Sequence, residues 1–392
     1  MGILGWRGLA AAAIVLLAAA NPAAGQAASD PVRDAVEEQL RLLDMSELEA
    51  VLESLNEDVR RQLPVRSLRE LIFEPERGMA LDPVRLAQDM LYYLIGELVV
   101  QSRLLGQLII LAVLCAVLQN LAGSLSRGAP DVGFLAAYAV VIYLGLQSFS
   151  IAAGIGRETL DAMASFMFAL LPLLATMLAA VGAVSSAALF HPLLVTVVTL
   201  VVNLIDRVVF PLLFLAAVLG VAGHLIKEFS LSKLAGLFRH GAITALGLAF
   251  TLFLGVMVIR GAIAPVADGV ALRASKFLAG AFIPVIGGMM ADAVEVVVGG
   301  SLLVKNAVGV FGMVAMLVMV AFPMLKVLAL VVIYRMATAL VQPVSDPRLV
   351  EALGTMADTL TVLLASVMTA ALMFFVAITV VVGVGNLAAV VR

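Results

Sequence analysis

One apolar stretch of the chain carries side chains that could handle charge. Lys276, Asp292, Glu295 and Lys305 are ionisable, and Asp292 and Glu295 are three residues apart, so they share one face of a helix. Ionisable groups at membrane depth are costly and often mark ion paths, relays or charge pairs. The pattern therefore predicts a polar lining or charge pair inside a helical bundle. The alternative is an interfacial segment with solvated charges and snorkelling lysines.

The same stretch contains residues that interrupt helices. Pro284 removes a backbone donor, and glycines follow it directly. Irregular backbone at membrane depth persists only where protein buries it or water reaches it. We therefore predict a Gly/Pro-broken re-entrant or interfacial segment over 273–306. The polar lining or gating role is assigned to Lys276, Pro284, Gly287, Gly288, Asp292, Glu295, Lys305, Asn306 and Lys326.

Small residues cluster in and just after this segment. In membrane bundles such residues let helices approach closely, and this is a commoner role than conduction. The sequence therefore predicts helix packing at Gly299, Gly300, Ser301, Gly309 and Gly312.

The elements that must position these residues are membrane helices. Hydrophobic residues make up 63% of the chain, charged residues only 13%, and the mean hydropathy is +1.13. These values exclude a soluble globular protein and predict an all-α, polytopic membrane bundle. About eight spans are expected, with seven to nine plausible. They lie at about 104–121, 132–152, 166–184, 191–205, 208–226, 242–260, 307–334 and 358–385, with a tight polar turn at Asp206-Arg207.

The N-terminal part reads as an export signal followed by an exported region. A basic residue, a short apolar run and small residues predict a signal peptide over 1–25. Residues 26–100 form an acidic, helical region, and 101–392 the transmembrane domain. In the exported region Ser46 begins a capping-box pattern, and the apolar stripe behind it indicates a small bundle or a partner surface. Pro83 is placed to start a helix that continues into the bilayer.

Catalytic signatures are missing from the sequence. It contains no phosphate-cradling loop motif, no H-E-x-x-H and no nucleophile elbow, and its one cysteine, Cys115, excludes an intramolecular disulfide. We therefore expect no enzymatic activity, no catalytic residue, no cofactor, no metal and no nucleic-acid partner.

The membrane topology and a faint internal repeat allow a second function. The basic loop over 227–240 is the best cytoplasmic candidate and could form an amphipathic surface helix, which agrees with an exported N-terminus. Phe210-Pro211 and Phe322-Pro323 each precede an apolar run, an amphipathic connector and another span. Such duplication around a broken segment is also typical of a self-sufficient secondary transporter with a midplane site.

Several motifs resemble one known family. They are K-F-x-x-x-F-I-P-V-I-G-G-M at 276–289, S-L-L-V-K-N-A-V-G at 301–309, F-P-x-L-K at 322–326 and M-F-F-V-A-I-T at 373–379. Together they resemble stage III sporulation protein AE, most densely over about 270–392. The signal sequence, acidic helical region and polytopic body agree with the family's layout.

This resemblance implies an assembly component rather than an enzyme. It implies a multi-pass protein of the mother-cell membrane around the forespore, needed for endospore formation and working in a secretion-like channel or feeding apparatus. Its N-terminal region would lie in the intermembrane space. The implied partners are other stage III A proteins, namely a cytoplasmic ATPase and ring-forming membrane proteins, together with a forespore membrane protein. The lipid bilayer and further copies of the chain are also expected partners.

Overall fold

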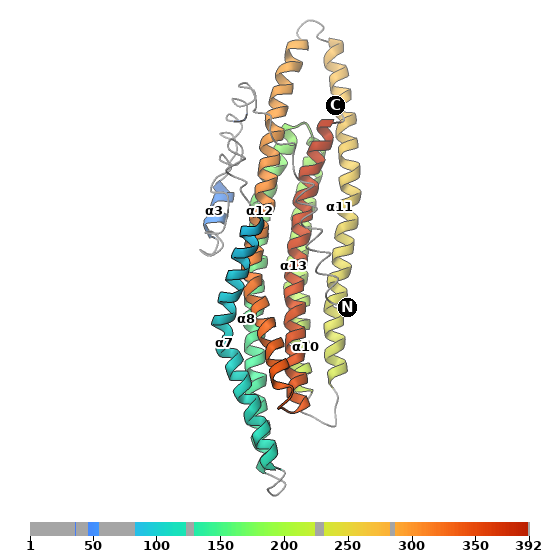
Figure 1. Ribbon diagram of the computed structural model, residues 1–392. Coiled ribbons are helices and arrows are strands. Elements are labelled where there is room, and N and C mark those ends of the chain that lie inside the picture. Colours follow the sequence, from blue (N-terminus) through green and yellow to red (C-terminus); the bar gives the residue numbers. More distant parts are fainter. Residues whose placement is uncertain are drawn as a thin grey trace.

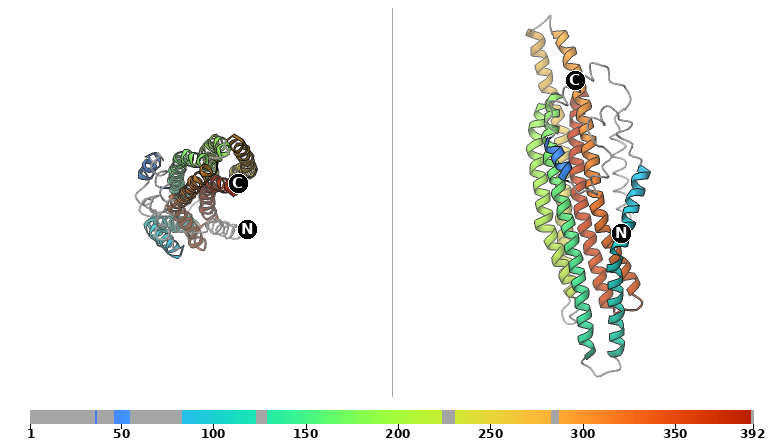
Figure 2. Two further views of the ribbon diagram at one scale, coloured as in Figure 1. Left: turned by 90° about the horizontal axis from the view of Figure 1, so that it is seen from above. Right: turned by 90° about the vertical axis from the view of Figure 1, so that its left-hand side faces the viewer.

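The chain folds into an elongated bundle of long helices that run alternately up and down its axis (Figures 1 and 2). The computed structural model describes residue 36 and residues 46–54, 83–122, 129–223, 231–282 and 287–390. Within these ranges the all-α prediction is confirmed. The elements are α3 (Ser46–Ser54), α7 (Pro83–Ala122), α8 (Ala129–Ala180), α9 (Val184–Leu204), η1 (Ile205–Val209), α10 (Phe210–Ala222), α11 (Ser232–Phe282), α12 (Gly287–Val341) and α13 (Pro347–Val390).

Six helical segments of the described ranges are long and apolar enough to cross a membrane, which confirms a polytopic membrane protein. They are Leu86–Leu118, Leu135–Ala180, Val184–Ala222, Ser232–Ile263, Val297–Val341 and Pro347–Asn386. The number differs from the eight expected because two pairs of predicted segments have merged. The segment 132–152 and most of 166–184 lie in α8, and 191–205 and the described part of 208–226 lie in one helical run over 184–222.

The polar turn predicted at Asp206-Arg207 is wrong. Both residues lie in η1, a π-helical turn that joins α9 to α10 without reversing the chain. The Nε of Arg157, in α8, lies 2.6 Å from Oδ1 of Asp206. Because the two charges neutralise each other across neighbouring helices, each helix can continue where its hydropathy falls. A π-turn inside an α-helix is a feature often found at functional sites.

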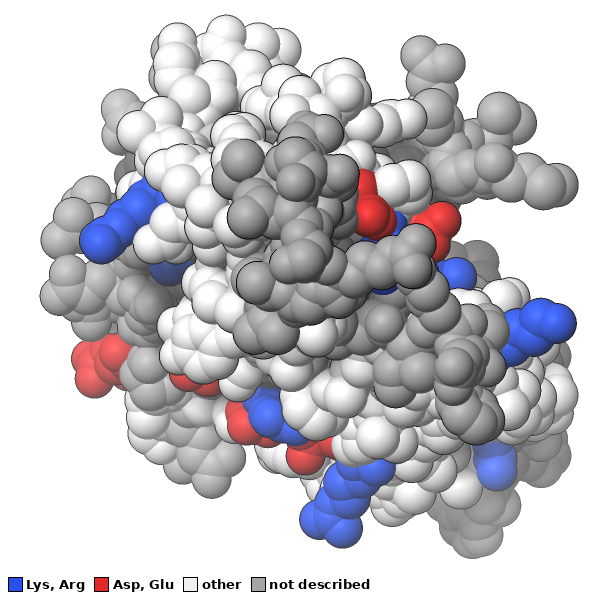
Figure 3. Space-filling view, turned by 90° about the horizontal axis from the view of Figure 1, so that it is seen from below, with Lys and Arg blue, Asp and Glu red and all other residues white. Residues whose placement is uncertain are grey.

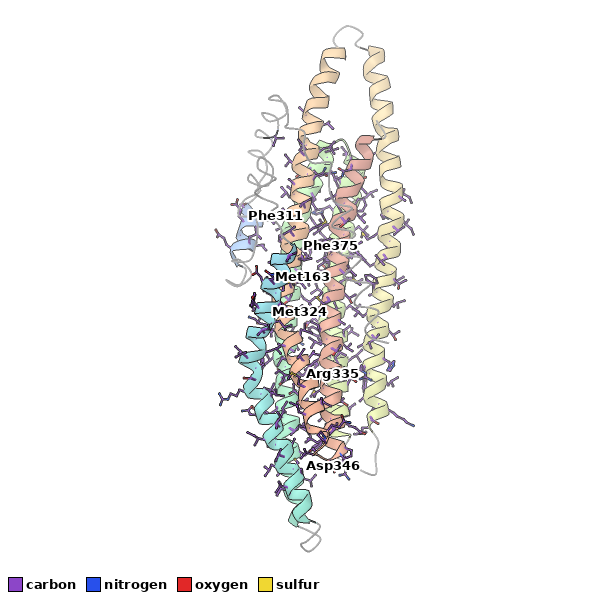
Figure 4. The ribbon with its side chains drawn as sticks, viewed as in Figure 1. Met163, Phe311, Met324, Arg335, Asp346 and Phe375 are labelled. Carbon is purple, nitrogen blue, oxygen red and sulfur yellow. The ribbon has the colours of Figure 1, made fainter. Side chains whose placement is uncertain are left out.

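Helices α12 and α13 occupy the centre of the bundle. Helix α13 contacts α8, α9, α10, α11 and α12. Met163 of α8, Phe311 and Met324 of α12 and Phe375 of α13 lie in the shared core (Figure 4). The core also contains polar pairs with satisfied hydrogen bonds: the buried Tyr334 hydroxyl lies 2.9 Å from the Ser148 Oγ, which itself lies 2.8 Å from the Leu144 carbonyl oxygen.

Two described helices contain the residues at which the sequence predicted helix starts. Helix α3 includes Ser46, the first residue of the capping box, and packs on α8 with Leu48 only 2% exposed. Helix α7 includes Pro83 and continues to Ala122, so the boundary assigned at residue 100 falls inside it. The signal peptide lies outside the described residues.

The segment expected to be broken over 273–306 is largely helical. Helices α11 and α12 extend beyond the rest of the bundle at its upper end (Figure 1), and α12 is continuous from Gly287 to Val341. Residues 283–286, which include Pro284, lie outside the described residues. Glycines within the helix do not break it, because the i to i−4 hydrogen bonds need no side chain.

The predicted amphipathic connector over 227–240 is not a separate surface helix in its described part. Residues from Ser232 onward form the first turns of α11. There Arg239 Nη1 lies 3.1 Å from Oδ2 of Asp358 in α13, and Arg335 Nη2 of α12 lies 2.7 Å from Oδ1 of the same carboxylate. One aspartate thus links three helices near the lower end, where side chains of both charges are visible from below (Figure 3).

Candidate functional site

Lys305 is a cation buried in the interior of the bundle. Its side chain projects from α12 and is 0% exposed. Its Nζ donates to the carbonyl oxygen of Val382 and to Oδ1 of Asn386, both at 2.8 Å and both in α13. Among the described residues no carboxylate lies within ion-pair distance of it. A buried charge held only by neutral oxygens is energetically unfavourable, so its presence calls for a function.

A glycine makes room for this lysine. A Cβ atom at Gly385 would collide with the Nζ of Lys305 and would come within 3.0 Å of Leu178 in α8. Only a residue without a side chain fits where α8, α12 and α13 converge. The sequence reasoning did not select Gly385 or Asn386, because both lie 80 or more residues from Lys305 and no local pattern marks them.

The neighbouring residue adds an unsatisfied polar atom. Asn306 is half-buried, and its Oδ1 atom is buried without a hydrogen-bond donor among the described residues. Leaving such an atom unpaired costs about 1–3 kcal/mol. Lys305 and Asn306 therefore form the part of the predicted polar lining that the structure places inside the bundle.

The other predicted lining residues are not gathered around Lys305. Lys326 is half-buried on the same helix, 21 residues and about 31 Å further along. Lys276 is part of α11, and the backbones of Gly287, Gly288, Asp292 and Glu295 belong to the first turns of α12. The side chains of Lys276, Asp292 and Glu295 lie outside the described part of the chain, as does Pro284.

The predicted packing residues separate into two groups. A Cβ atom at Gly309 would collide with Cγ2 of Val382, and one at Gly312 would lie 2.6 Å from Leu170 Cδ2. Gly299 differs, because nothing lies within 4 Å of its Cβ position. Gly300 and Ser301 are buried, and the Ser301 hydroxyl donates to the Val297 carbonyl at 2.8 Å.

Asp268 is a second buried charge, which the sequence reasoning missed. It lies in α11 and is 2% exposed. Its carboxylate accepts hydrogen bonds from the backbone N–H groups of Ser185 and Ser186, at 3.0 and 3.3 Å, and from the Ser186 hydroxyl. These groups form the first turn of α9, whose own N-cap residue, Ala183, provides no side-chain hydrogen bond. A carboxylate from another helix therefore caps α9.

Asp268→Ala is expected to lower the stability of the bundle by about 1–3 kcal/mol, because three donors would lose their acceptor. Asp268→Asn keeps one carbonyl oxygen and should lose less. The measurement is thermal unfolding of the full chain in detergent. Asp161→Ala, at an exposed position of α8, is the matched control and should shift stability by no more than about 0.5 kcal/mol. If Asp268→Ala unfolds at the wild-type temperature, the cap contributes nothing.

Lys305 and Asp268 lie near the same end of the bundle. Gly385, beside Lys305, is close to Leu178, and Asp268 binds Ser185 and Ser186. Leu178 and Ser185 flank the reversal at Val181–Ala183 that joins α8 to α9. They are the two fully buried charged residues among those that the structure describes.

Comparisons with known proteins identify the family. A family model described as stage III sporulation protein AE matches residues 67–385. The chain is also 37% identical over 309 residues to stage III sporulation protein AE of Bacillus subtilis (strain 168). The aligned region covers 79% of this chain and 77% of that protein. No solved structure matches. With the polytopic helical fold already described, the chain therefore belongs to the stage III sporulation protein AE family.

Proposed function

We propose that this protein is a non-enzymatic, integral membrane component of the channel that connects the mother cell with the engulfed forespore. The observation that carries the proposal is the family match over 67–385, which includes all six apolar helices. The buried cation Lys305 agrees with a transport-related role, because intramembrane charge is retained mainly for function.

The proposed location is the mother-cell membrane around the forespore. In this arrangement the acidic region of 26–100 lies between the two membranes and contacts a forespore membrane protein. The other proposed partners are a cytoplasmic ATPase and ring-forming membrane proteins of the same sporulation stage. The positive residues near the start of α11, including Lys233 and Arg239, favour a cytoplasmic lower end.

Deleting the protein from sporulating cells is expected to block the formation of heat-resistant spores after engulfment, and re-expression of the full chain should restore it. The readouts are spore counts after heating and microscopy of engulfed forespores. Purification of a tagged chain from sporulating cells should recover the ATPase and the ring-forming proteins. Normal spore counts in the deletion strain would refute the sporulation role. Recovery of the chain without any of these proteins would refute the channel assignment.

A self-sufficient secondary transporter is the alternative function, and one observation favours it. The two Phe-Pro units form similar antiparallel hairpins, α10 with α11 and the second half of α12 with α13. Paired repeats of this kind often surround a midplane site. The alternative predicts solute flux into vesicles that contain only this protein, whereas a channel component should require its partners.

A further inference from the structure

The two sides of the bundle expose different chemistry. On α11 the exposed side chains between 248 and 263 are largely apolar, with Leu248 61%, Leu252 62% and Ile259 59% exposed. On α8 the exposed positions from Arg157 to Thr176 carry mainly charged, hydroxyl or small groups. They are Arg157, Glu158, Asp161, Ser165, Phe168, Pro172 and Thr176.

The polar face continues onto the neighbouring helix. Beside Arg157 lie Asp206, with its side chain 42% exposed, and the exposed Arg207 of η1. On α9 the face that leads to Arg207 bears Thr196, Thr199 and Asn203, together with Leu200, which is 57% exposed. We call the charged residues Arg157, Glu158, Asp161, Asp206 and Arg207, together with Ser165 and Thr176, the α8 polar face.

This face is incompatible with lipid. A charged side chain at the centre of a bilayer costs about 2.5–3.5 kcal/mol on insertion scales, and this face exposes five of them. Hydroxyl groups such as that of Thr196 donate to a carbonyl of their own helix and can therefore face lipid. The argument against lipid on this face therefore depends on its charged residues. The charged residues lie close together along the bundle, because Arg157 to Asp161 covers about 6 Å of α8 and Asp206 of η1 pairs with Arg157.

A second observation points the same way. Helix α3 comes from the acidic N-terminal region and packs on α8. It buries Leu48 but leaves Ser46, Glu49 and Glu53 exposed. The described part of α3 carries exposed glutamates, so water must surround this helix where it packs on α8, because lipid would leave those carboxylates unsolvated.

We propose that the α8 polar face forms one wall of a water-filled path for hydrated, polar solutes, while the α11 side faces lipid. The wall carries two positive and three negative side chains, Arg157 and Arg207 against Glu158, Asp161 and Asp206. Such a balance gives weak selection between anions and cations. This proposal rests on the channel function proposed above. It adds that the α8 polar face is the surface of this chain that contacts the transported solutes.

The test is thiol labelling of the full chain reconstituted in vesicles, on a Cys115→Ala background. Single cysteines are placed by Asp161→Cys and Ser165→Cys on the polar face and by Leu252→Cys and Val256→Cys on α11. Asp268 contacts the start of α9, next to the reversal that joins α8 to α9, so this end of the bundle is a common reference point. Leu252 lies about 24 Å from it along α11, and Asp161 lies about 30 Å from it along α8, so the two sides are compared at similar depth. Met163→Cys is the buried control.

A membrane-impermeant thiol reagent should label the Asp161→Cys and Ser165→Cys chains at least about tenfold faster than the α11 variants, because thiols in apolar surroundings form little thiolate. Protection of all four positions would overturn the proposal, and so would labelling at Asp161→Cys and Ser165→Cys that appears only after detergent is added. Equal labelling of all four would also overturn it, since that depth would then lie outside lipid.

Each cysteine variant is checked by thermal unfolding, and exposed substitutions should shift stability by no more than about 0.5 kcal/mol. Vesicle labelling needs no sporulating cell, so its result is independent of the sporulation role. A positive labelling pattern in a protein whose deletion leaves spore counts normal would preserve the water-lined wall and refute only the channel's proposed biological setting.

Discussion

Lys305→Met is expected to reduce heat-resistant spores to nearly the level of a deletion strain while the protein stays folded and abundant. Methionine has a similar length and no charge, so it fits the space beside Gly385. The substitution removes the cost of burying the ammonium, which is several kcal/mol for an ion in a protein interior. Stability should therefore stay within about 1 kcal/mol of the wild type, because this gain offsets the hydrogen bonds that the Val382 carbonyl oxygen and the Asn386 side chain both lose.

The controls separate a functional charge from a packing role. Lys305→Arg keeps the charge, but its larger planar head meets the same crowded glycine and should also fail. Lys326→Met, at a half-buried lysine of the same helix, should retain most spore formation. Spore counts, protein levels and unfolding temperatures are measured for all three. Normal spores from Lys305→Met would show that the charge itself has no role.

The second large effect is expected from Gly309. Gly309→Leu should destabilise the bundle by about 3 kcal/mol or more, because overpacking forces side chains or helices apart. The obstacle is Cγ2 of Val382, a β-branched side chain that cannot swing away in a helix. Gly309→Ala should already weaken the contact between α12 and α13.

Two other glycines give a graded comparison for unfolding in detergent. At Gly312 the nearest atom is the end of the Leu170 side chain, which can change rotamer, so Gly312→Ala should cost less than Gly309→Ala. At Gly299 the Cβ position is open, and Gly299→Ala should be neutral or stabilising by up to about 1 kcal/mol. The order Gly309, Gly312, Gly299 is the prediction. Equal losses at all three would contradict it.

The sequence predicted helices better than it predicted where they end. Ser46 and Pro83 carry local helix signals, and both residues lie in helices, α3 and α7. Hydropathy alone could not show that α8 continues through Arg157. Charged residues lower the hydropathy of an apolar run in the same way whether they lie in a polar turn or form an ion pair with a neighbouring helix. The pairing partner, Asp206, is 49 residues away and is known only once the fold is known.

The candidate site was partly predictable for the same reason. Lys305 is conspicuous as a charge within an apolar run, and the structure buries it. Asp268 has an equally informative position, but it is surrounded by Ala, Gly and Pro, which resemble a loop. Its partners Ser185 and Ser186 are more than 80 residues away, so its capping role could not be read from spacing.

The central position of α13 has a consequence for biogenesis. This helix follows the other described helices along the chain and so leaves the ribosome after them, yet it contacts five of them. Segments emerge N-terminal first during synthesis, so α7 to α12 must remain in the bilayer with their inner surfaces uncovered until residues 347–390 arrive. The bundle therefore closes only after α13 has emerged, and a truncation before residue 347 should leave an insertion intermediate for quality-control proteases.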